Sequence, residues 1–417
     1  MTRAGSTALV AVALGLFLGC WALLHHGALG RGQLPDTGTY ARYGDAIADG
    51  AVPYRDFRLE YPPGALPVFV LPSLGHEGDQ AAYDRWFDRL MALCGCIAIC
   101  AAALALLALG AGGVRTGVAL GLMALSPLLL GSVVLSRFDY WPAALVALAL
   151  AALLWERHAL AALALGAAVA AKLWPVVLVP LALLWVWRSR GERAAAGWVA
   201  GLVAVDAACF LPFAVLSPGG HQASFHSQLA RPLQLESLGS ALLIAVHHLA
   251  GTHLTVVSQF GSQNPSGSGV HALGVASTAV SAVAVTGIWL LFERGPATGE
   301  RLVAHAAAAV AVLLAFGKVF SPQFLIWLVP LVPLVRGRRG FGAGVLLAAA
   351  LALTQAWFPR HYWPLANRLA PTQSWLLLVR DLAVVALAAL LAWPRAEREP
   401  LGEGRARLAA LGRMRVP

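Results

Sequence analysis

Residues 90–110 read "LMALCGCIAICAAALALLALG", an uncharged apolar run close to the roughly 20 residues with which a helix crosses a bilayer. Of the 417 residues in the chain, 59% are hydrophobic and only 12% are charged, whereas about 25% are charged in ordinary soluble domains. This composition predicts an all-α polytopic membrane protein. Working outward from the first run, we place further spans near 5–24, 117–135, 140–155, 195–216, 270–292, 299–317, 341–358 and 373–394.

Two proline-marked regions add short helices to these spans. The run 159–187 is interrupted by "KLWP", where Lys172 and Pro175 predict two short helices that meet at one membrane face. Another short helix is expected after "GKVFSPQ", over 324–335. We therefore expect about twelve crossings. They form one transmembrane domain over residues 1–394, with outer loops at 25–64 and 217–269 and a basic tail at 395–417.

The orientation follows from the charges, because Lys and Arg remain in excess on the cytoplasmic side of a membrane. With the N-terminus inside, the cytoplasmic segments hold 17 of the 30 Lys and Arg but only 7 of the 20 Asp and Glu. The net charge of +10 then lies on the inner face, where it meets anionic lipid headgroups, and no nucleic-acid partner is needed to explain it. We expect a multi-pass protein of a bacterial inner membrane, with both termini in the cytoplasm.

Polar residues collect at the opposite, outer face. Residues 34–64, "LPDTGTYARYGDAIADGAVPYRDFRLEYPPG", hold five acids, three arginines and four prolines. The outer segments "SRFDYWP", "HQASFHSQLARPLQLESLG", "KVFSPQ" and "FPRHYWP" add further polar and aromatic residues. Sugar transfer from a lipid-phosphate donor needs these residue types: a carboxylate takes the acceptor proton, cations hold the leaving phosphate, and aromatic faces bind the sugar.

The two lysines stand out among the basic residues. Lys172 and Lys318 are the only lysines among 30 basic residues, and both follow the outer ends of predicted helices. A lysine ammonium can pair with a phosphate, so we expect both lysines and Arg231 to bind the donor phosphate. Simple snorkelling of each lysine to the membrane surface is the alternative.

Several of these segments resemble a known family. "DTGTYARYGDAIADGAVPYRDFRLEYPPGALPVF", "AAKLWPVVLVPLALL", "ARPLQLESLGSAL" and "KVFSPQFLIWLVPLV" are similar to segments of the C-type glycosyltransferases, specifically glycosyltransferase family 87. The resemblance implies a polyprenyl-phosphate sugar donor, most often mannose, a lipid or glycan acceptor, and an acid in the first outer loop as catalytic base. Asp36 matches that acid by position. It is followed by Thr37 rather than by a second acid, so no cofactor is indicated and a bound divalent metal is left open.

Most site candidates also have a plainer interpretation. Asp36 could cap the helix that follows it. Tyr54 and Tyr61 could anchor the loop at the interface, Glu60 could be solvated, and Arg231–Glu236 and Arg137–Asp139 could be simple ion pairs. The residues that we expect to bind substrate are Tyr40, Tyr54, Glu60, Tyr61, Arg137, Asp139, His226, Glu236 and Gln323.

A transporter or lipid flippase is the competing function. The segments that follow Lys172 and Lys318 form a loose internal repeat of broken helices, which is typical of transporters. The polar residues, however, gather outside rather than at the bilayer midplane, which favours a transferase.

Overall fold

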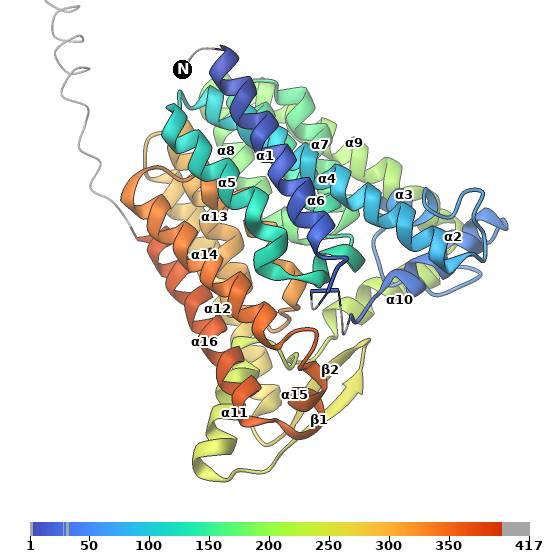
Figure 1. Cartoon of the computed structure of the whole chain (residues 1–417). Coiled ribbons are helices and arrows are strands. Elements are labelled where there is room, and N and C mark those ends of the chain that lie inside the picture. The colour runs from blue at the N-terminus through green and yellow to red at the C-terminus, as the bar shows by residue number, and fades with distance from the viewer. Residues whose placement is uncertain (1–2, 28, 31–32, 394–417) are drawn as a thin grey trace, which may run out of the picture.

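The computed structural model describes residues 3–27, 29–30 and 33–393 as a tall bundle of helices (Figure 1). The predicted tail at 395–417 lies outside the described residues. The elements are α1 (Arg3–Leu23), α2 (Thr37–Ala48), α3 (Leu66–Val70), α4 (Gln80–Ala108), α5 (Gly113–Leu130), α6 (Tyr140–Leu154), α7 (His158–Ala171), α8 (Val179–Arg190), α9 (Glu192–Leu216), α10 (Pro218–Leu229), α11 (Leu238–Ala250), β1 (Leu254–Gln259), β2 (Ser262–Gly267), α12 (Val270–Glu293), α13 (Gly299–Phe316), α14 (Gly337–Trp357), α15 (Tyr362–Arg368) and α16 (Pro371–Ala392), with short 3₁₀ turns between some of them.

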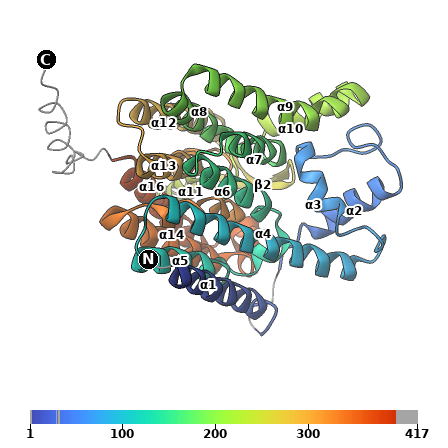
Figure 2. The same cartoon turned by 90° about the horizontal axis from the view of Figure 1, so that it is seen from above.

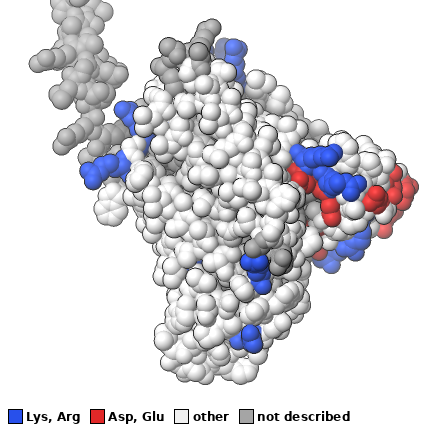
Figure 3. Space-filling view, viewed as in Figure 1, with Lys and Arg blue, Asp and Glu red and all other residues white. Residues whose placement is uncertain are grey.

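The long helices agree with the predicted membrane architecture. Among the described residues, eight helices are long and apolar enough to cross a bilayer, and shorter apolar helices include α6 and α7. Figure 3 shows that the wall formed by α1, α5 and α14 carries almost no charge, whereas Lys, Arg, Asp and Glu gather on the lobe built by α2 and α3. The count of twelve crossings stays a prediction, because it depends on segments shorter than a usual span.

The proline-marked segments differ from each other. The break at "KLWP" is confirmed: α7 ends before Lys172, and a 3₁₀ turn, η3 (Trp174–Leu178), leads into α8. The helix expected over 324–335 is instead a pair of 3₁₀ turns, η4 (Pro322–Leu328) and η5 (Val332–Leu334). Each proline there lacks an N–H group and clashes with the preceding turn, so a regular α-helix cannot continue through the segment.

The outer loops are more ordered than the sequence suggests. The first loop folds into α2 and α3, which project from one side of the bundle when it is seen from above (Figure 2). The second loop contains α10, α11 and an antiparallel β1–β2 hairpin, none of which the apolar pattern predicts. Backbone bonds connect this loop to its neighbours: Gln234 N donates to the carbonyl of Lys318 at 2.9 Å, and Leu235 N donates to that of Gln263 at 2.9 Å.

A buried ion pair joins three of these segments beneath the outer loops. Asp139, at the start of α6, is only 1% exposed, and its Oδ1 accepts hydrogen bonds from Lys172 Nζ at 2.7 Å and from Trp327 Nε1 at 2.6 Å. The ammonium also lies 4.7 Å from the ring centre of Phe138 and 4.9 Å from that of Phe324. Lys172 therefore does not snorkel, and Asp139 pairs with Lys172 rather than with Arg137.

Replacing Lys172 with Met should leave the Asp139 carboxylate buried without its cation. We expect a loss of about 3–5 kcal/mol in the free energy of unfolding, measured in detergent by denaturant titration. The double variant Lys172→Met/Asp139→Leu removes both charges and should recover most of that loss. Lys318→Met is the matched control, because the Lys318 ammonium donates to the Leu229 carbonyl and lies nearer the surface. Equal losses in both single lysine variants would contradict the assignment.

Candidate active site

Asp36 lies in the loop that follows α1, immediately before α2. Its carboxylate forms an ion pair with the guanidinium of Arg137, which also donates to the Leu34 carbonyl at 2.9 Å. The Asp36 side chain is 38% exposed, whereas that of Arg137 is 9% exposed. Asp36 occupies the N-cap position of α2, but its side chain makes no capping hydrogen bond. The capping interpretation is therefore wrong for the side chain, which faces an arginine and solvent instead.

An aromatic cluster fixes Asp36 relative to the bundle. The Tyr40 hydroxyl lies 3.4 Å from Asp36 Oδ2. The Tyr40 ring, which is only 1% exposed, stacks on Phe69 at 4.4 Å and meets Tyr61 and Phe138 at 5.7 and 5.8 Å. In the chain, Phe138 follows Arg137, which pairs with Asp36, and precedes Asp139, which pairs with Lys172. The aromatic cluster therefore links the first loop to both ion pairs. Tyr40 and Tyr61 therefore pack beside Asp36 within an apolar aromatic cluster.

The three residues predicted to bind the donor phosphate differ in their surroundings. Lys318, which follows α13, donates to the Leu229 carbonyl at 2.9 Å. Burial lowers the pKa of Lys318, and the charge of Arg231 lowers it further. The charge of Arg231 also acts on Lys172. Because the Lys172 ammonium is already bound by Asp139, Lys318 and Arg231 are the members of this set that can meet an incoming anion.

Glu236 belongs to a buried network that the sequence patterns do not predict. It is 3% exposed, and burial raises its pKa to about 7. No ion pair with Arg231 is found among the described residues, so the simple pairing expected for these two is wrong. Instead, Arg380 Nη2 donates to the Glu236 carbonyl at 2.7 Å and pairs with Asp381 at 2.9 Å. The signal was present, since an Arg–Asp pair inside the apolar run of α16 is costly unless it serves a purpose.

The remaining predicted residues lie around this centre. The Tyr54 ring is 6% exposed and its hydroxyl donates to the Tyr61 carbonyl at 2.6 Å, so its contacts are those of a loop anchor. Glu60 is half-buried, and its carbonyl accepts from Gln228 at 2.9 Å. His226 is exposed on α10, and Gln323 is half-buried in η4. Burial lowers the pKa of Arg231, and the charge of Glu60 is among those that oppose this shift.

A cavity lies near the Asp36–Arg137 pair, although neither of these two side chains is in its lining. It has a volume of about 410 Å³ and is lined by the residues on either side of Asp36, Pro35 and Thr37, and by Ser136 next to Arg137. The opposite wall comes from α4, with Asp84 and Asp88 in the lining. The Asp88 carboxylate accepts from Trp21 Nε1 at 2.8 Å and lies 3.3 Å from His25 Nε2. This wall offers carboxylates and arginines to a polar ligand.

The described residues contain no group of three His, Cys, Asp or Glu side chains placed to hold a metal ion. The five cysteines are all free.

Comparisons with known proteins agree with the fold and with the predicted family. The chain is similar to the crystal structure of ArnT from Cupriavidus metallidurans bound to undecaprenyl phosphate, with a TM-score of 0.50 and 16% identity over 94% of this chain and 77% of that one. The apo form of ArnT gives a TM-score of 0.49, 16% identity, and 93% and 76% coverage. No curated protein matches the chain.

The family comparison covers most of the site. The model of glycosyltransferase family 87 matches residues 59–322, more than half of the chain. That range includes Arg137, Asp139, Lys172, Arg231 and Lys318, whereas Asp36 precedes it. The prediction of an all-α polytopic membrane protein is thereby confirmed, and the transferase interpretation is favoured over a transporter. The chain belongs to glycosyltransferase family 87, and it is a glycosyltransferase.

Proposed function

We propose that this enzyme transfers a hexose, with mannose as the first candidate, from a polyprenyl-phosphate donor to a lipid or glycan acceptor at the outer face of a bacterial inner membrane. The observation that carries the proposal is the position of Asp36. Its carboxylate is partly exposed and pairs with Arg137, and the next residue, Phe138, packs against the ammonium of Lys172. This is the arrangement that a base and a phosphate cradle require.

The donor fits the end of the bundle at which the cations lie. A polyprenyl tail remains in the bilayer, so its phosphate must be met where the helices reach the surface. Lys318 and Arg231 stand there, and a charge-assisted hydrogen bond to phosphate is among the stronger polar contacts. ArnT, which shares the fold, was crystallised with undecaprenyl phosphate, and this supports a lipid phosphate as the carrier.

The reaction is an inverting displacement. The acceptor hydroxyl oxygen attacks the anomeric carbon of the sugar while Asp36 takes the hydroxyl proton. The bond between the anomeric carbon and the phosphate oxygen breaks, and the polyprenyl phosphate leaves with that electron pair. Arg137 is a positioning residue, because its ion pair holds the Asp36 carboxylate in place. Lys318 and Arg231 stabilise the charge that develops on the leaving phosphate.

The acceptor is expected to approach from the cavity beside Asp36. Its lining combines carboxylates and arginines rather than an apolar surface, which suits a polyhydroxylated headgroup or glycan. Asp139 is unsuitable as an alternative base, since it is 1% exposed and bound by Lys172 and Trp327. Glu60 remains the next candidate.

Asp36→Asn keeps the shape of the side chain and removes its basicity. We expect the variant to insert and bind donor normally but to lose on the order of 10²-fold or more in turnover. The measurement is transfer of radiolabel from polyprenyl-phosphate mannose into glycolipid by membranes that contain the protein. Asp49→Asn is the matched control, because Asp49 lies exposed at the other end of α2. Near-normal turnover in Asp36→Asn would show that Asp36 is not the base, and Glu60 would become the candidate.

Lys318→Gln tests the phosphate cradle separately from the base. Loss of one charge-assisted hydrogen bond corresponds to roughly 1.5–3 kcal/mol, so donor affinity should fall by about ten- to a hundredfold while the protein stays folded. Arg231→Gln should behave similarly. Arg58→Gln, at an exposed position of the first loop, should change little. Unchanged donor affinity in both Lys318→Gln and Arg231→Gln would show that neither residue binds the donor phosphate.

The orientation can be tested with single cysteines in a variant that lacks the native ones. Asp49→Cys and Ala223→Cys lie on exposed positions at the proposed outer face, and Ser189→Cys is exposed at the other end, in the last turn of α8. In intact cells, an impermeant thiol reagent should label the first two and spare the third. Labelling at Ser189→Cys alone would reverse the proposed topology and place both termini outside.

A further inference from the structure

The β1–β2 hairpin ends in a turn whose sequence does not match its conformation. Gln259 pairs with Ser262, so the turn itself consists of Phe260 and Gly261. Both residues have a positive φ, 53° for Phe260 and 64° for Gly261, which makes this a type I′ turn. Glycine adopts that conformation freely, and the usual residue before it is Asn, Asp or a second Gly. A phenylalanine there is a strained outlier, and such outliers concentrate at ligand-binding sites.

Polar contacts hold the turn in place without covering the phenylalanine. Asn264, which is 1% exposed, donates from Nδ2 to the Gln259 carbonyl at 3.0 Å. The hairpin is anchored in turn by the bond from Leu235 N to the Gln263 carbonyl. Phe260 is nevertheless 43% exposed. Burial of the ring therefore does not offset the strain, and the ring is open to a ligand.

The turn lies beside the carboxylate of Glu60. A Cβ atom on Gly261 would be 3.6 Å from Glu60 Oε2. The backbone of Glu60 is fixed by Gln228, which donates to its carbonyl at 2.9 Å. Within the described ranges, the Glu60 carboxylate has no hydrogen bond or ion pair. An exposed aromatic ring and an open carboxylate suit a sugar, because the C–H face of a sugar packs on the ring and its hydroxyl groups donate to the carboxylate.

One short segment joins the hairpin to the proposed phosphate ligands. Gln234 N donates to the Lys318 carbonyl, and the next residue, Leu235, donates from N to the Gln263 carbonyl, both at 2.9 Å. Lys318 and the hairpin thus lie beside consecutive residues of the segment that begins with Arg231. In a polyprenyl-phosphate sugar, the hexose is bonded directly to the phosphate. A phosphate at Lys318 and Arg231 therefore places its sugar close to the hairpin.

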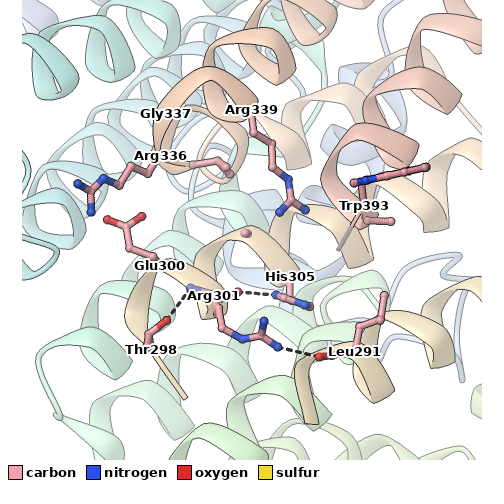
Figure 4. A pocket seen from close by; sticks show the side chains of 12 residues that line it. Leu291, Thr298, Glu300, Arg301, His305, Arg336, Gly337, Arg339 and Trp393 are labelled. Carbon is pink, nitrogen blue, oxygen red and sulfur yellow. Dashed lines mark hydrogen bonds between the residues drawn. The ribbon is translucent and has the colours of Figure 1, made fainter. Parts of the chain in front are cut away.

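A polar cavity at the other end of α13 cannot hold the same sugar. It has a volume of about 330 Å³ and includes Glu300, Arg301 and Arg336 in its lining (Figure 4). The Glu300 carboxylate is already bound by Arg115 through hydrogen bonds of 2.6 and 2.9 Å. Lys318 follows the opposite end of α13, so the helix separates it from this cavity by about 27 Å at a rise of 1.5 Å per residue.

We propose that Phe260 and Glu60 form the subsite for the hexose of the donor. The sugar ring lies on the Phe260 ring, and its hydroxyl groups donate to the Glu60 carboxylate. The inference rests on the proposed function, because it takes the position of the phosphate from Lys318 and Arg231. The acceptor is expected from the cavity near Asp36, which none of these residues lines. Phe260 is thus a specificity-determining residue that acts on the sugar and on neither the base nor the phosphate.

The test uses two lipids of equal charge, polyprenyl-phosphate mannose and the sugar-free polyprenyl methyl phosphate, in equilibrium binding to the purified full-length protein. Loss of about 55 Å² of apolar contact corresponds to about tenfold in affinity. Phe260→Ala should therefore weaken the mannosyl lipid by about tenfold and leave the methyl diester unchanged, and Glu60→Gln should also weaken only the mannosyl lipid. Val257→Ala, at an exposed position of the same hairpin, is the matched control. Lys318→Gln should weaken both lipids, because they share the phosphate.

Phe260→Asn separates sugar binding from a structural role. Asn before Gly is a favoured sequence for a type I′ turn, so this variant should keep or raise the midpoint of thermal unfolding while it weakens the mannosyl lipid. Phe260→Trp should retain binding. The subsite is overturned if Phe260→Asn binds the mannosyl lipid like wild type, or if it weakens both lipids equally, which would place the ring on the polyprenyl chain. Wild-type protein that binds neither lipid would overturn the proposed donor itself.

Discussion

The buried carboxylate of Asp139 is the constraint on which the outer half of this protein depends. A charge that is 1% exposed among apolar helices is tolerable only with a partner, and Lys172 and Trp327 supply two hydrogen bonds to the same oxygen. Lys172 follows α7, and Trp327 belongs to η4, so one carboxylate fixes two proline-broken segments against the start of α6. Lys172 lies just before η3, and Lys318 lies shortly before η4, so both lysines are placed by these segments.

The first outer loop is held to this frame by contacts that leave little freedom. A Cβ atom on Gly64 would lie 2.4 Å from the backbone carbon of Ala170, so only glycine lets the loop approach α7 this closely. Trp141 Nε1 donates to the Gly64 carbonyl at 3.0 Å, and Ser217 holds the Tyr54 carbonyl at 2.9 Å. With the aromatic cluster around Tyr40, these contacts fix where α2 starts. The position of Asp36 is therefore set by packing rather than by the loop sequence around it.

Sequence patterns predicted the features that depend on local chemistry. Apolar runs gave the spans, the "KLWP" break was found where Pro175 interrupts a run, and the polar residues were assigned to one face. Pairing partners were not predictable in the same way, because Asp36–Arg137 and Asp139–Lys172 join residues far apart in the chain. The hairpin at Leu254–Gln259 and Ser262–Gly267 is not predictable from the sequence, because its strands lack a regular apolar alternation. Arg380 lies inside an apolar run that predicts only a span, so its pairing with Asp381 becomes visible in the structure alone.

α13 separates the two charged ends of the molecule and limits how they can influence each other. It is buried on almost every side and rich in alanine, as expected for a helix packed within a bundle. Two unit charges about 27 Å apart interact by only about 0.6 kcal/mol at an effective dielectric constant of 20. A change of charge near Arg301 therefore has little direct electrostatic effect at Lys318. Any larger coupling between the two ends would require α13 to move against its neighbours, which a close-packed helix resists.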